Sequence, residues 1–120
     1  MASIIEREAR TPESRRIISG ILWKRIEIGM PLQVDASFNY VNGKNSFQLT
    51  TKDLATDSPY NTYTNRGLPP TPISNPGLEA ILAALEPTPT PYLFYLSDRQ
   101  GKFYFAKTHE EHVRNKELHL

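Results

Sequence analysis

Glu6 is the residue whose setting in this chain best suits acid–base chemistry. It follows Ile4 and Ile5 in a segment, residues 2–9, that reads as a short helix, so buried positions flank its carboxyl group. A carboxyl group partly withdrawn from water keeps its proton to higher pH, as a general acid acting on a glycosidic bond requires. The alternative is a surface ion pair with Arg10, worth about 0.3–0.5 kcal/mol. The residues by themselves favour the ion pair and leave the acid open.

A long loop supplies a candidate binding surface. The proline density from Ser58 to Gly77 excludes a helix and a central strand. This loop of roughly twenty residues is much longer than the ~4–6 residues of a usual connection, and ordered loops of that length are often functional. Tyr60, Asn61 and Tyr63 lie among its prolines and glycines. Phenol faces suit pyranose rings and amides suit sugar hydroxyl and acetamido groups, so the loop favours a sugar ligand. Packing of the tyrosines within the loop is the alternative.

Two other polar clusters give weaker evidence of a functional site. His109 and His112 are three residues apart, whereas the zinc motif needs a spacing of four, and no third ligand is near. We therefore predict no metal, and an exposed first helical turn at this place. The arginines within residues 7–16 could meet an acidic ligand, although a solvated helix face is favoured. No dinucleotide or phosphate-loop fingerprint is present, so no cofactor is predicted.

Composition limits the class of protein. A chain of 120 residues is expected to form one domain. Its net charge of +1, from 14 Lys+Arg and 13 Asp+Glu, gives no reason to expect a nucleic acid partner. There is no cysteine, which excludes disulfides and thiolate chemistry. No apolar run reaches the ~18–20 residues of a membrane span, and no signal peptide is recognisable.

Helix signals dominate the first half of the chain. Thr11 and Pro12 predict a helix start, and Gly29 predicts its end. The expected buried face holds Ile17, Ile18, Ile21, Leu22 and Ile26, and the expected outer face holds Arg15, Arg16, Lys24 and Arg25. Gly20 inside this helix suggests close packing against a neighbour. Thr50 with Asp53 predicts a helix of one or two turns, whereas most of residues 30–49 have no clear assignment.

The second half predicts one more buried helix, a hairpin and a final helix. Asn75 is expected to cap a helix that ends at Pro87 and buries Leu78, Ile81, Leu82 and Leu85. Residues 92–97 and 102–106 read as two strands joined by a turn, and Thr108 with Glu111 predicts a last helix. The predicted class is α+β, dominated by helices, with a C-terminal β-hairpin followed by a final helix.

Short motifs run along nearly the whole chain. They are Ala-Ser-Ile-Ile-Glu-Arg-Glu-Ala at 2–9, Gly-Met-Pro-Leu-Gln-Val-Asp at 29–35, Ser-Pro-Tyr-Asn-Thr-Tyr at 58–63, Gly-Leu-Pro-Pro at 67–70, Ile-Ser-Asn-Pro-Gly at 73–77, and Tyr104-Phe105 through His112, Arg114 and Asn115. In this order and spacing the chain resembles the MltG-type (YceG-like) endolytic murein transglycosylases. The resemblance implies a lysozyme-like/YceG-like catalytic domain.

The resemblance also implies a reaction. The family's catalytic glutamate matches Glu6, which would act as acid and then as base while the β-1,4 bond between MurNAc and GlcNAc of peptidoglycan is cleaved to leave 1,6-anhydro-MurNAc ends. Tyr60 and Asn61 would orient the sugar, with Gln33, Tyr63 and Asn75 as further substrate-binding candidates and Asp35 as a second polar group. One carboxyl group suffices because the substrate supplies its own nucleophile, whereas a hydrolase needs two.

The family context sets further expectations. Residues 1–120 would be a single catalytic domain isolated from a longer parent, which is anchored at the extracytoplasmic face of the bacterial inner membrane. Peptidoglycan strands and cell-wall synthases are the expected partners, and a monomer is expected. The sequence departs from the family at Ala36-Ser37, where Pro-Thr is frequent, and over residues 39–47. A peptidoglycan-binding module without activity and a muramidase-type hydrolase are the alternative functions.

Overall fold

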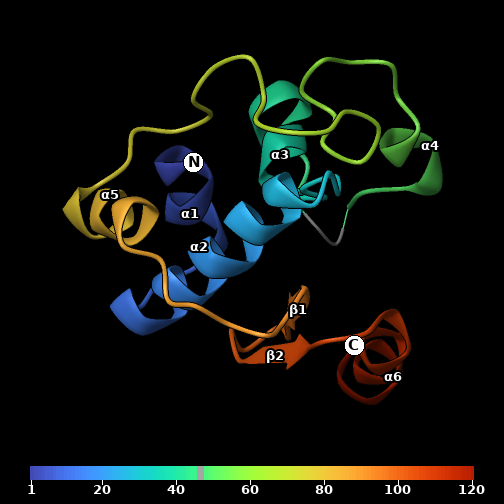
Figure 1. Ribbon diagram of the computed structural model, residues 1–120. Helices are drawn as coiled ribbons and strands as arrows, with labels where there is room; N and C mark the ends of the chain where they lie inside the picture. The colour runs from blue at the N-terminus through green and yellow to red at the C-terminus, as the bar shows by residue number, and fades with distance from the viewer. Residues whose placement is uncertain (46–47) are drawn as a thin grey trace.

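Helices are the main regular elements of the fold, and a small hairpin lies at one side (Figure 1). The computed structural model describes residues 1–45 and 48–120. Among these residues no helix has both the length and the apolar character needed to cross a bilayer. The elements, in chain order, are α1 (Ala2–Glu8), α2 (Pro12–Glu27), α3 (Ala36–Asn42), α4 (Thr51–Leu54), α5 (Leu78–Leu85), β1 (Phe94–Ser97), β2 (Phe103–Ala106) and α6 (His109–His119).

Capping residues start three of the helices as the sequence predicts. The Thr11 hydroxyl accepts a hydrogen bond from the Ser14 amide at 3.1 Å, and the Ser14 hydroxyl accepts one in return from the Thr11 amide. Thr50 and Asp53 form the same reciprocal pair at the start of α4. At α6 the Thr108 hydroxyl accepts from the amide of Glu111. Each cap satisfies backbone donors that the first turn leaves without partners.

Helix α3 fills a stretch that the sequence left unassigned. It begins after Asp35 and ends at Gly43, whose φ of 74° is the left-handed conformation that glycine adopts at little cost. Asn42 and Gly43 therefore form the C-terminal end of a helix. The divergent segment 39–47 begins within α3, and its residues 46–47 lie outside the described residues.

The core lies where α1, α2 and α5 pack together, with the 32–34 segment closing one side. Helix α1 contacts both α2 and α5, and α2 contacts α5. The segment at 32–34 alternates buried, exposed and buried residues, so that only its middle side chain faces outward. The apolar residues buried in this cluster are Ile4, Ile5, Ala9, Ile18, Leu22, Leu32, Val34, Ile73, Ala80 and Ala83.

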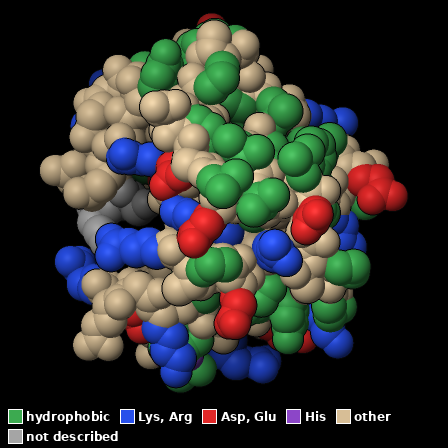
Figure 2. All heavy atoms as spheres, turned by 90° about the vertical axis from the view of Figure 1, so that its left-hand side faces the viewer, with side chains coloured by type: hydrophobic (Ala, Val, Ile, Leu, Met, Phe, Trp, Pro, Cys, Tyr) green, Lys and Arg blue, Asp and Glu red, His purple; other side chains and the backbone are tan. Residues whose placement is uncertain are grey.

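The predicted buried face of α5 is wrong. Leu78 and Leu85 are 71% and 74% exposed, and Ile81 and Leu82 are exposed as well. Ala80 and Ala83 are buried instead, because small side chains let α5 lie close to α1 and α2. Every residue of α5 except Glu79 is apolar, so its hydrophobic period gave little basis for choosing the alanine face over the leucine face. Figure 2 looks at this side of the molecule and shows hydrophobic side chains gathered on the surface.

The predicted outer face of α2 also needs correction. Arg25 is only 4% exposed, and the side chain of Arg15 is 11% exposed. Both bury a charged group among partners that accept its hydrogen bonds, a condition that burial of a charge requires. The buried positions Ile18, Ile21 and Leu22 agree with the prediction.

The hairpin was predicted correctly. Strands β1 and β2 pair in antiparallel register from Phe94 opposite Ala106 to Ser97 opposite Phe103. The Asp98 carboxylate accepts a hydrogen bond from the amide of Gln100 in the connecting turn. Helix α6 packs on both strands, apart from the α1–α2–α5 cluster (Figure 1).

We predict that Gly20→Ala destabilises the protein. In an open helix alanine would be better by about 1 kcal/mol. Here a Cβ atom at position 20 would lie 2.1 Å from the carbonyl oxygen of Thr88, whose amide is fixed by a 3.0 Å hydrogen bond to the Arg16 carbonyl. The backbone must therefore shift, at a cost of about 1–3 kcal/mol.

Thermal unfolding measures this effect, with Glu27→Ala at an exposed position of the same helix as control. The control should change stability by less than about 0.5 kcal/mol. A Gly20→Ala protein as stable as the wild type, or more stable, would contradict the packing described.

Candidate acid–base site

Glu6 is held in an ion pair and a backbone hydrogen bond. Its Oε2 atom lies 3.0 Å from Nη2 of Arg15, and its Oε1 atom accepts a 2.8 Å hydrogen bond from the amide of Gly77. Arg15 also pairs with Glu79 at 3.3 Å. Both carboxylate oxygens of Glu6 are therefore engaged, and they link α1 to α2 and to the start of α5. The ion pair considered from sequence exists, but its partner is Arg15 and not Arg10.

Glu8 has a different environment on the same helix. Two residues advance an α-helix by about 200°, so Glu8 faces away from Glu6. Its Oε1 atom accepts a 2.6 Å hydrogen bond from the hydroxyl of Tyr95. The residue keeps some surface exposed, yet protein atoms crowd its carboxyl group, and this burial raises the pKa of Glu8 to about 7. The charge of Asp35 raises the pKa further, whereas Tyr95 and Arg25 act to lower it.

Arg25 connects the elements around Glu8. Its Nε and Nη2 atoms donate to the carbonyl of Leu93 at 2.9 and 2.7 Å, and its Nη1 atom donates to the carbonyl of Leu32. The guanidinium carbon lies 5.6 Å from the ring centre of Tyr95, within cation–π range. Burial lowers the pKa of Arg25, while Tyr95 and Glu8 act to raise it.

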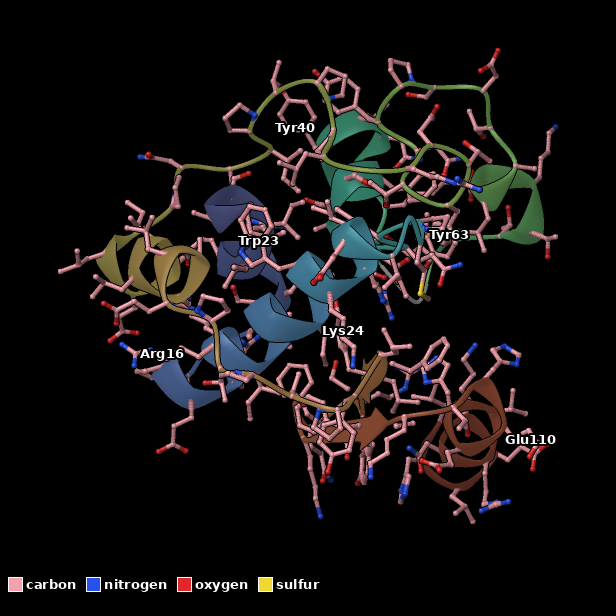
Figure 3. The ribbon with its side chains drawn as sticks, in the orientation of Figure 1. Arg16, Trp23, Lys24, Tyr40, Tyr63 and Glu110 are labelled. Carbon is pink, nitrogen blue, oxygen red and sulfur yellow. The ribbon has the colours of Figure 1, made fainter. Side chains whose placement is uncertain are left out.

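A second pair of tyrosine and carboxylate lies beside the first. The hydroxyl of Tyr63 donates to Oδ1 of Asp35 at 2.6 Å. Burial, Asp35 and Glu8 raise the pKa of Tyr63, so this hydroxyl stays protonated. In Figure 3 Tyr63 lies near the C-terminal end of α2, below the loop that carries it. Asp35 and Tyr63 both interact with the charge of Glu8, which joins the two pairs into one cluster.

Gln33 has the most unusual backbone near this cluster. Its φ of 54° is positive, unlike that of any other non-glycine residue among those described. The Gln33 amide donates to the Thr62 carbonyl at 3.1 Å, and the Thr62 hydroxyl bonds both polar backbone groups of Val34. These contacts hold the strained residue and leave its side chain exposed. Strain of this kind is found preferentially at functional sites.

The other predicted loop residues have mixed positions. Tyr60 is half-buried, bonds the Thr71 hydroxyl at 2.9 Å and packs its ring 5.3 Å from that of Tyr40, which Figure 3 labels under the arch of the loop. Asn75 is exposed and does not cap α5, because Gly77 occupies the cap position. The predicted cap was therefore wrong.

Asn61 is buried inside the loop. Only 1% of its surface is exposed, and its amide nitrogen donates to the carbonyls of Leu54 and Thr56 at 3.0 and 2.8 Å. Its side-chain oxygen accepts from the amide of Tyr63 at 2.9 Å. This geometry favours a structural role for Asn61 over direct contact with a sugar.

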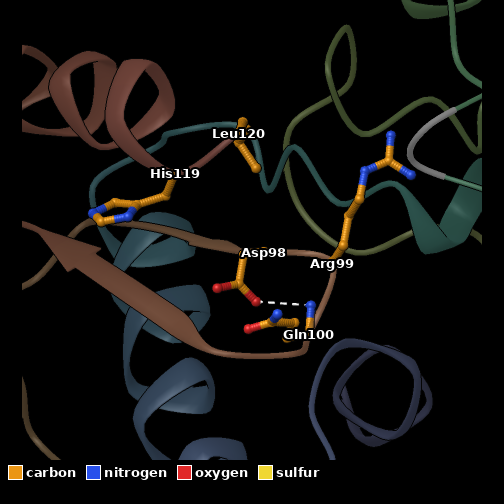
Figure 4. A pocket seen from close by; sticks show the side chains of 5 residues that line it. All are labelled: Asp98, Arg99, Gln100, His119 and Leu120. Atoms are coloured by element: carbon orange, nitrogen blue, oxygen red, sulfur yellow. Dashed lines mark hydrogen bonds between the residues drawn. The ribbon is translucent and has the colours of Figure 1, made fainter.

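Two other places do not contribute to the acid–base site. His112 stacks on Phe94, and burial lowers the pKa of His112 to about 4. In the described part of the chain no group of three or more His, Cys, Asp or Glu residues could hold a metal. A hollow of about 510 Å³ lies between the hairpin turn and the end of α6 (Figure 4). Its lining shares no residue with the Glu8 cluster. The lining residues are Asp98, Arg99, Gln100, His119 and Leu120.

Sequence reasoning missed Glu8, Tyr95 and Arg25. Glu8 lies two residues after the chosen acid, and only the three-dimensional partners distinguish the two carboxyl groups. Tyr95 read as one of several aromatic strand residues, and Arg25 read as a surface charge. A signal existed for Arg25, since it occurs four residues after Ile21 on the apolar side of α2.

The comparisons with known proteins point in one direction. The sequence model of the YceG-like family matches residues 1–118. A Bacillus subtilis (strain 168) protein named endolytic murein transglycosylase is 43% identical over 120 residues, which are all of this chain and 33% of that protein. A Streptococcus pneumoniae protein of the same name is 36% identical over 126 residues, which cover all of this chain and 23% of that protein. The chain thus spans a third or less of the length of these relatives.

A solved structure confirms the predicted fold. The crystal structure of a YceG-like protein from Listeria monocytogenes superposes with a TM-score of 0.87 at 46% sequence identity. The match covers 95% of this chain and 38% of that one. At this identity and TM-score the two proteins share the arrangement of helices and hairpin described above.

We predict that Asn61→Ala destabilises the loop and the whole domain. The change removes three part-buried hydrogen bonds, to the Leu54 and Thr56 carbonyls and from the Tyr63 amide, and each such bond contributes about 0.5–1.5 kcal/mol. Urea unfolding measures the change, with exposed Asn75→Ala as the matched control, for which less than about 0.5 kcal/mol is expected. Equal midpoints for the two variants would exclude the structural role of Asn61.

Proposed function

This chain belongs to the YceG-like family, and from that membership we propose that it is the catalytic part of an endolytic murein transglycosylase with Glu8 as its single acid and base. The proposed substrate is the β-1,4 bond between MurNAc and GlcNAc in peptidoglycan strands. The observation that carries the assignment is the crowded carboxyl group of Glu8, with one oxygen bound by Tyr95 and a pKa raised to about 7. Such a group holds a proton near neutral pH and can still release it.

The proposed reaction needs one carboxyl group. Glu8 gives its proton to the oxygen that links the two sugars while the bond between this oxygen and C1 of MurNAc breaks. The C6 hydroxyl oxygen of the same MurNAc then bonds to C1, and its proton passes to the Glu8 carboxylate. Glu8 returns to its protonated state, no water is consumed, and the new end is 1,6-anhydro-MurNAc.

Glu8 is preferred to Glu6, the residue expected from sequence. Glu6 makes an ion pair with Arg15, and its second oxygen accepts the Gly77 amide. The two contacts engage one oxygen each and tie the Glu6 carboxyl group to α2 and to the start of α5. The resemblance matched the family's catalytic glutamate to Glu6, and Glu8 lies in the same motif two residues later. The environment of the Glu8 carboxyl group is the reason for preferring Glu8.

The sugar is proposed to bind along the 33–35 segment and the loop. Gln33 is the strongest candidate for direct contact, because its exposed side chain stands on a strained backbone two residues before Asp35. Tyr63 would act through Asp35, and Tyr60 would offer the exposed part of its ring. Asn75, exposed at the end of the loop, stays a candidate for sugar contact, and Asn61 would support the loop from inside.

A muramidase-type hydrolase is the second candidate, because Asp35 is close enough to influence Glu8 electrostatically. A hydrolase would use a second carboxylate as nucleophile or base. The 2.6 Å hydrogen bond from Tyr63 occupies one oxygen of Asp35 and favours a supporting role instead. Binding without cleavage is the outcome expected if segments of the longer relatives are required for activity.

The cellular setting is part of the same proposal. Relatives three or more times as long as this chain carry the name endolytic murein transglycosylase. Residues 1–120 would accordingly be one catalytic domain of a membrane-anchored parent that acts outside the bacterial inner membrane, on peptidoglycan and beside cell-wall synthases. No cofactor is needed for the proposed reaction.

We predict that Glu8→Gln abolishes cleavage and that Glu6→Gln does not. The glutamine cannot transfer a proton, and general acid–base catalysis contributes about 10²- to 10⁴-fold. Purified peptidoglycan is incubated with each variant, and the sugar ends are identified by mass spectrometry. The wild type should give anhydro ends, and Glu8→Gln should be slower by at least about 100-fold.

Glu6→Gln is the matched control, because it makes the same chemical change two residues away. It should lose the Arg15 ion pair and some stability, so circular dichroism must first show both variants folded. If Glu6→Gln is inactive and Glu8→Gln is active, the acid and base of the reaction is Glu6. Reducing ends from the wild type would indicate a hydrolase, and binding without products would indicate a binding module.

A further inference from the structure

The hydroxyl of Tyr95 donates to one of the two carboxyl oxygens of Glu8, the Oε1 atom. The 2.6 Å separation has the length of a charge-assisted hydrogen bond between two oxygens. Burial and the charge of Glu8 raise the pKa of Tyr95 well above its ordinary value, so its hydroxyl stays a donor. A donor that always points at Oε1 leaves Oε2 as the atom that binds and releases a proton.

We propose that Tyr95 is a positioning residue, held in place by Arg25, that reserves Oε2 of Glu8 for proton transfer and sets the pH range of the reaction. This inference rests on the proposed function and adds a residue of the hairpin to it. The hairpin would thus complete the acid that α1 carries, although Tyr95 itself does not touch the reacting atoms.

Arg25 keeps Tyr95 at this distance from α1. Two of its nitrogens bind the Leu93 carbonyl, directly before β1, and a third binds the Leu32 carbonyl. Its guanidinium group also lies within 5.7 Å of the ring centres of Phe94 and Tyr95. A single buried side chain therefore ties the hairpin and the 32–35 segment to α2. Lysine could supply the charge but not this planar fork of donors.

The remaining groups around Glu8 have fixed partners. Asp35, before α3, faces Glu8 and is bound by Tyr63 of the loop. Arg25 faces it from α2, and Tyr95 faces it from β1. On α1 itself, Arg7 donates to Asn39, and Glu6 is turned to Arg15, which also engages Glu79 of α5. Within the described residues Tyr95 is thus the neutral donor bonded to the Glu8 carboxyl group.

The direction of the effect follows from the hydrogen bond. The Tyr95 hydroxyl stabilises the ionised form of Glu8 and so lowers its pKa. Tyr95→Phe removes this stabilisation, and the pKa of Glu8 must rise. Because the protonated carboxyl group is the acid, activity declines as pH increases through this pKa, and the decline moves to higher pH in the variant. A lost hydrogen bond to a charged group corresponds to about one pH unit.

The test is the pH dependence of kcat/KM on purified peptidoglycan for the wild type, Tyr95→Phe and Tyr104→Phe. Tyr104 on β2 is a matched control, since its hydroxyl bonds Asp98 at 3.2 Å in the hairpin turn and not Glu8. We expect the alkaline limb to move upward by about one unit in Tyr95→Phe and to stay in place in Tyr104→Phe.

A purely structural role for Tyr95 would lower activity at every pH without moving the limb, and that result would overturn the inference. Equal shifts in both phenylalanine variants would overturn it too. Glu8→Gln separates this failure from that of the proposed function. If Glu8→Gln is inactive and the alkaline limb of the Tyr95→Phe pH profile stays in place, only the proposed role of Tyr95 is refuted. If Glu8→Gln is active, Glu8 is not the acid and the proposed function of this residue is refuted.

Discussion

The buried guanidinium group of Arg25 is the contact on which the candidate site depends. It binds the carbonyls of Leu32 and Leu93, residues that are far apart in the chain and that lead into the two segments on either side of Glu8. A buried charge is tolerated only where its donors are satisfied, so this pairing selects one arrangement of hairpin and helices. Tyr95, Phe103 and Phe105 of the hairpin also pack against the apolar core, so Arg25 adds a directional polar contact to a hydrophobic one.

Two glutamates of one short helix consequently acquire different chemistry. Glu6 meets Arg15 and a backbone amide, while Glu8 meets crowding protein atoms, a phenol and the charge of Asp35. A spacing of two residues puts them on opposite sides of α1. The environment, and not the residue type, separates a structural carboxylate from a carboxyl group suited to proton transfer.

Local signals in the sequence predicted most of the fold and less of the site. Caps at Thr11, Thr50 and Thr108 and the hairpin turn depend on near neighbours, and these predictions are confirmed. The buried face of α5 depends on how closely Ala80 and Ala83 approach other helices, which no period within the helix reveals. The partners of Glu8 come from β1, α2 and the 33–35 segment, so only the folded chain brings them together. The role of Tyr95 has the same origin, since its strand lies 87 residues after Glu8.

Titration of the glutamate side chains tests the central claim most directly. Carboxyl ¹³C resonances of the glutamates are followed by NMR from acid to alkaline pH in the wild type and in the two glutamine variants. The account predicts one glutamate that titrates at about 7, is missing in Glu8→Gln and persists in Glu6→Gln. Titration of every glutamate near the ordinary pKa of about 4.3 would contradict it.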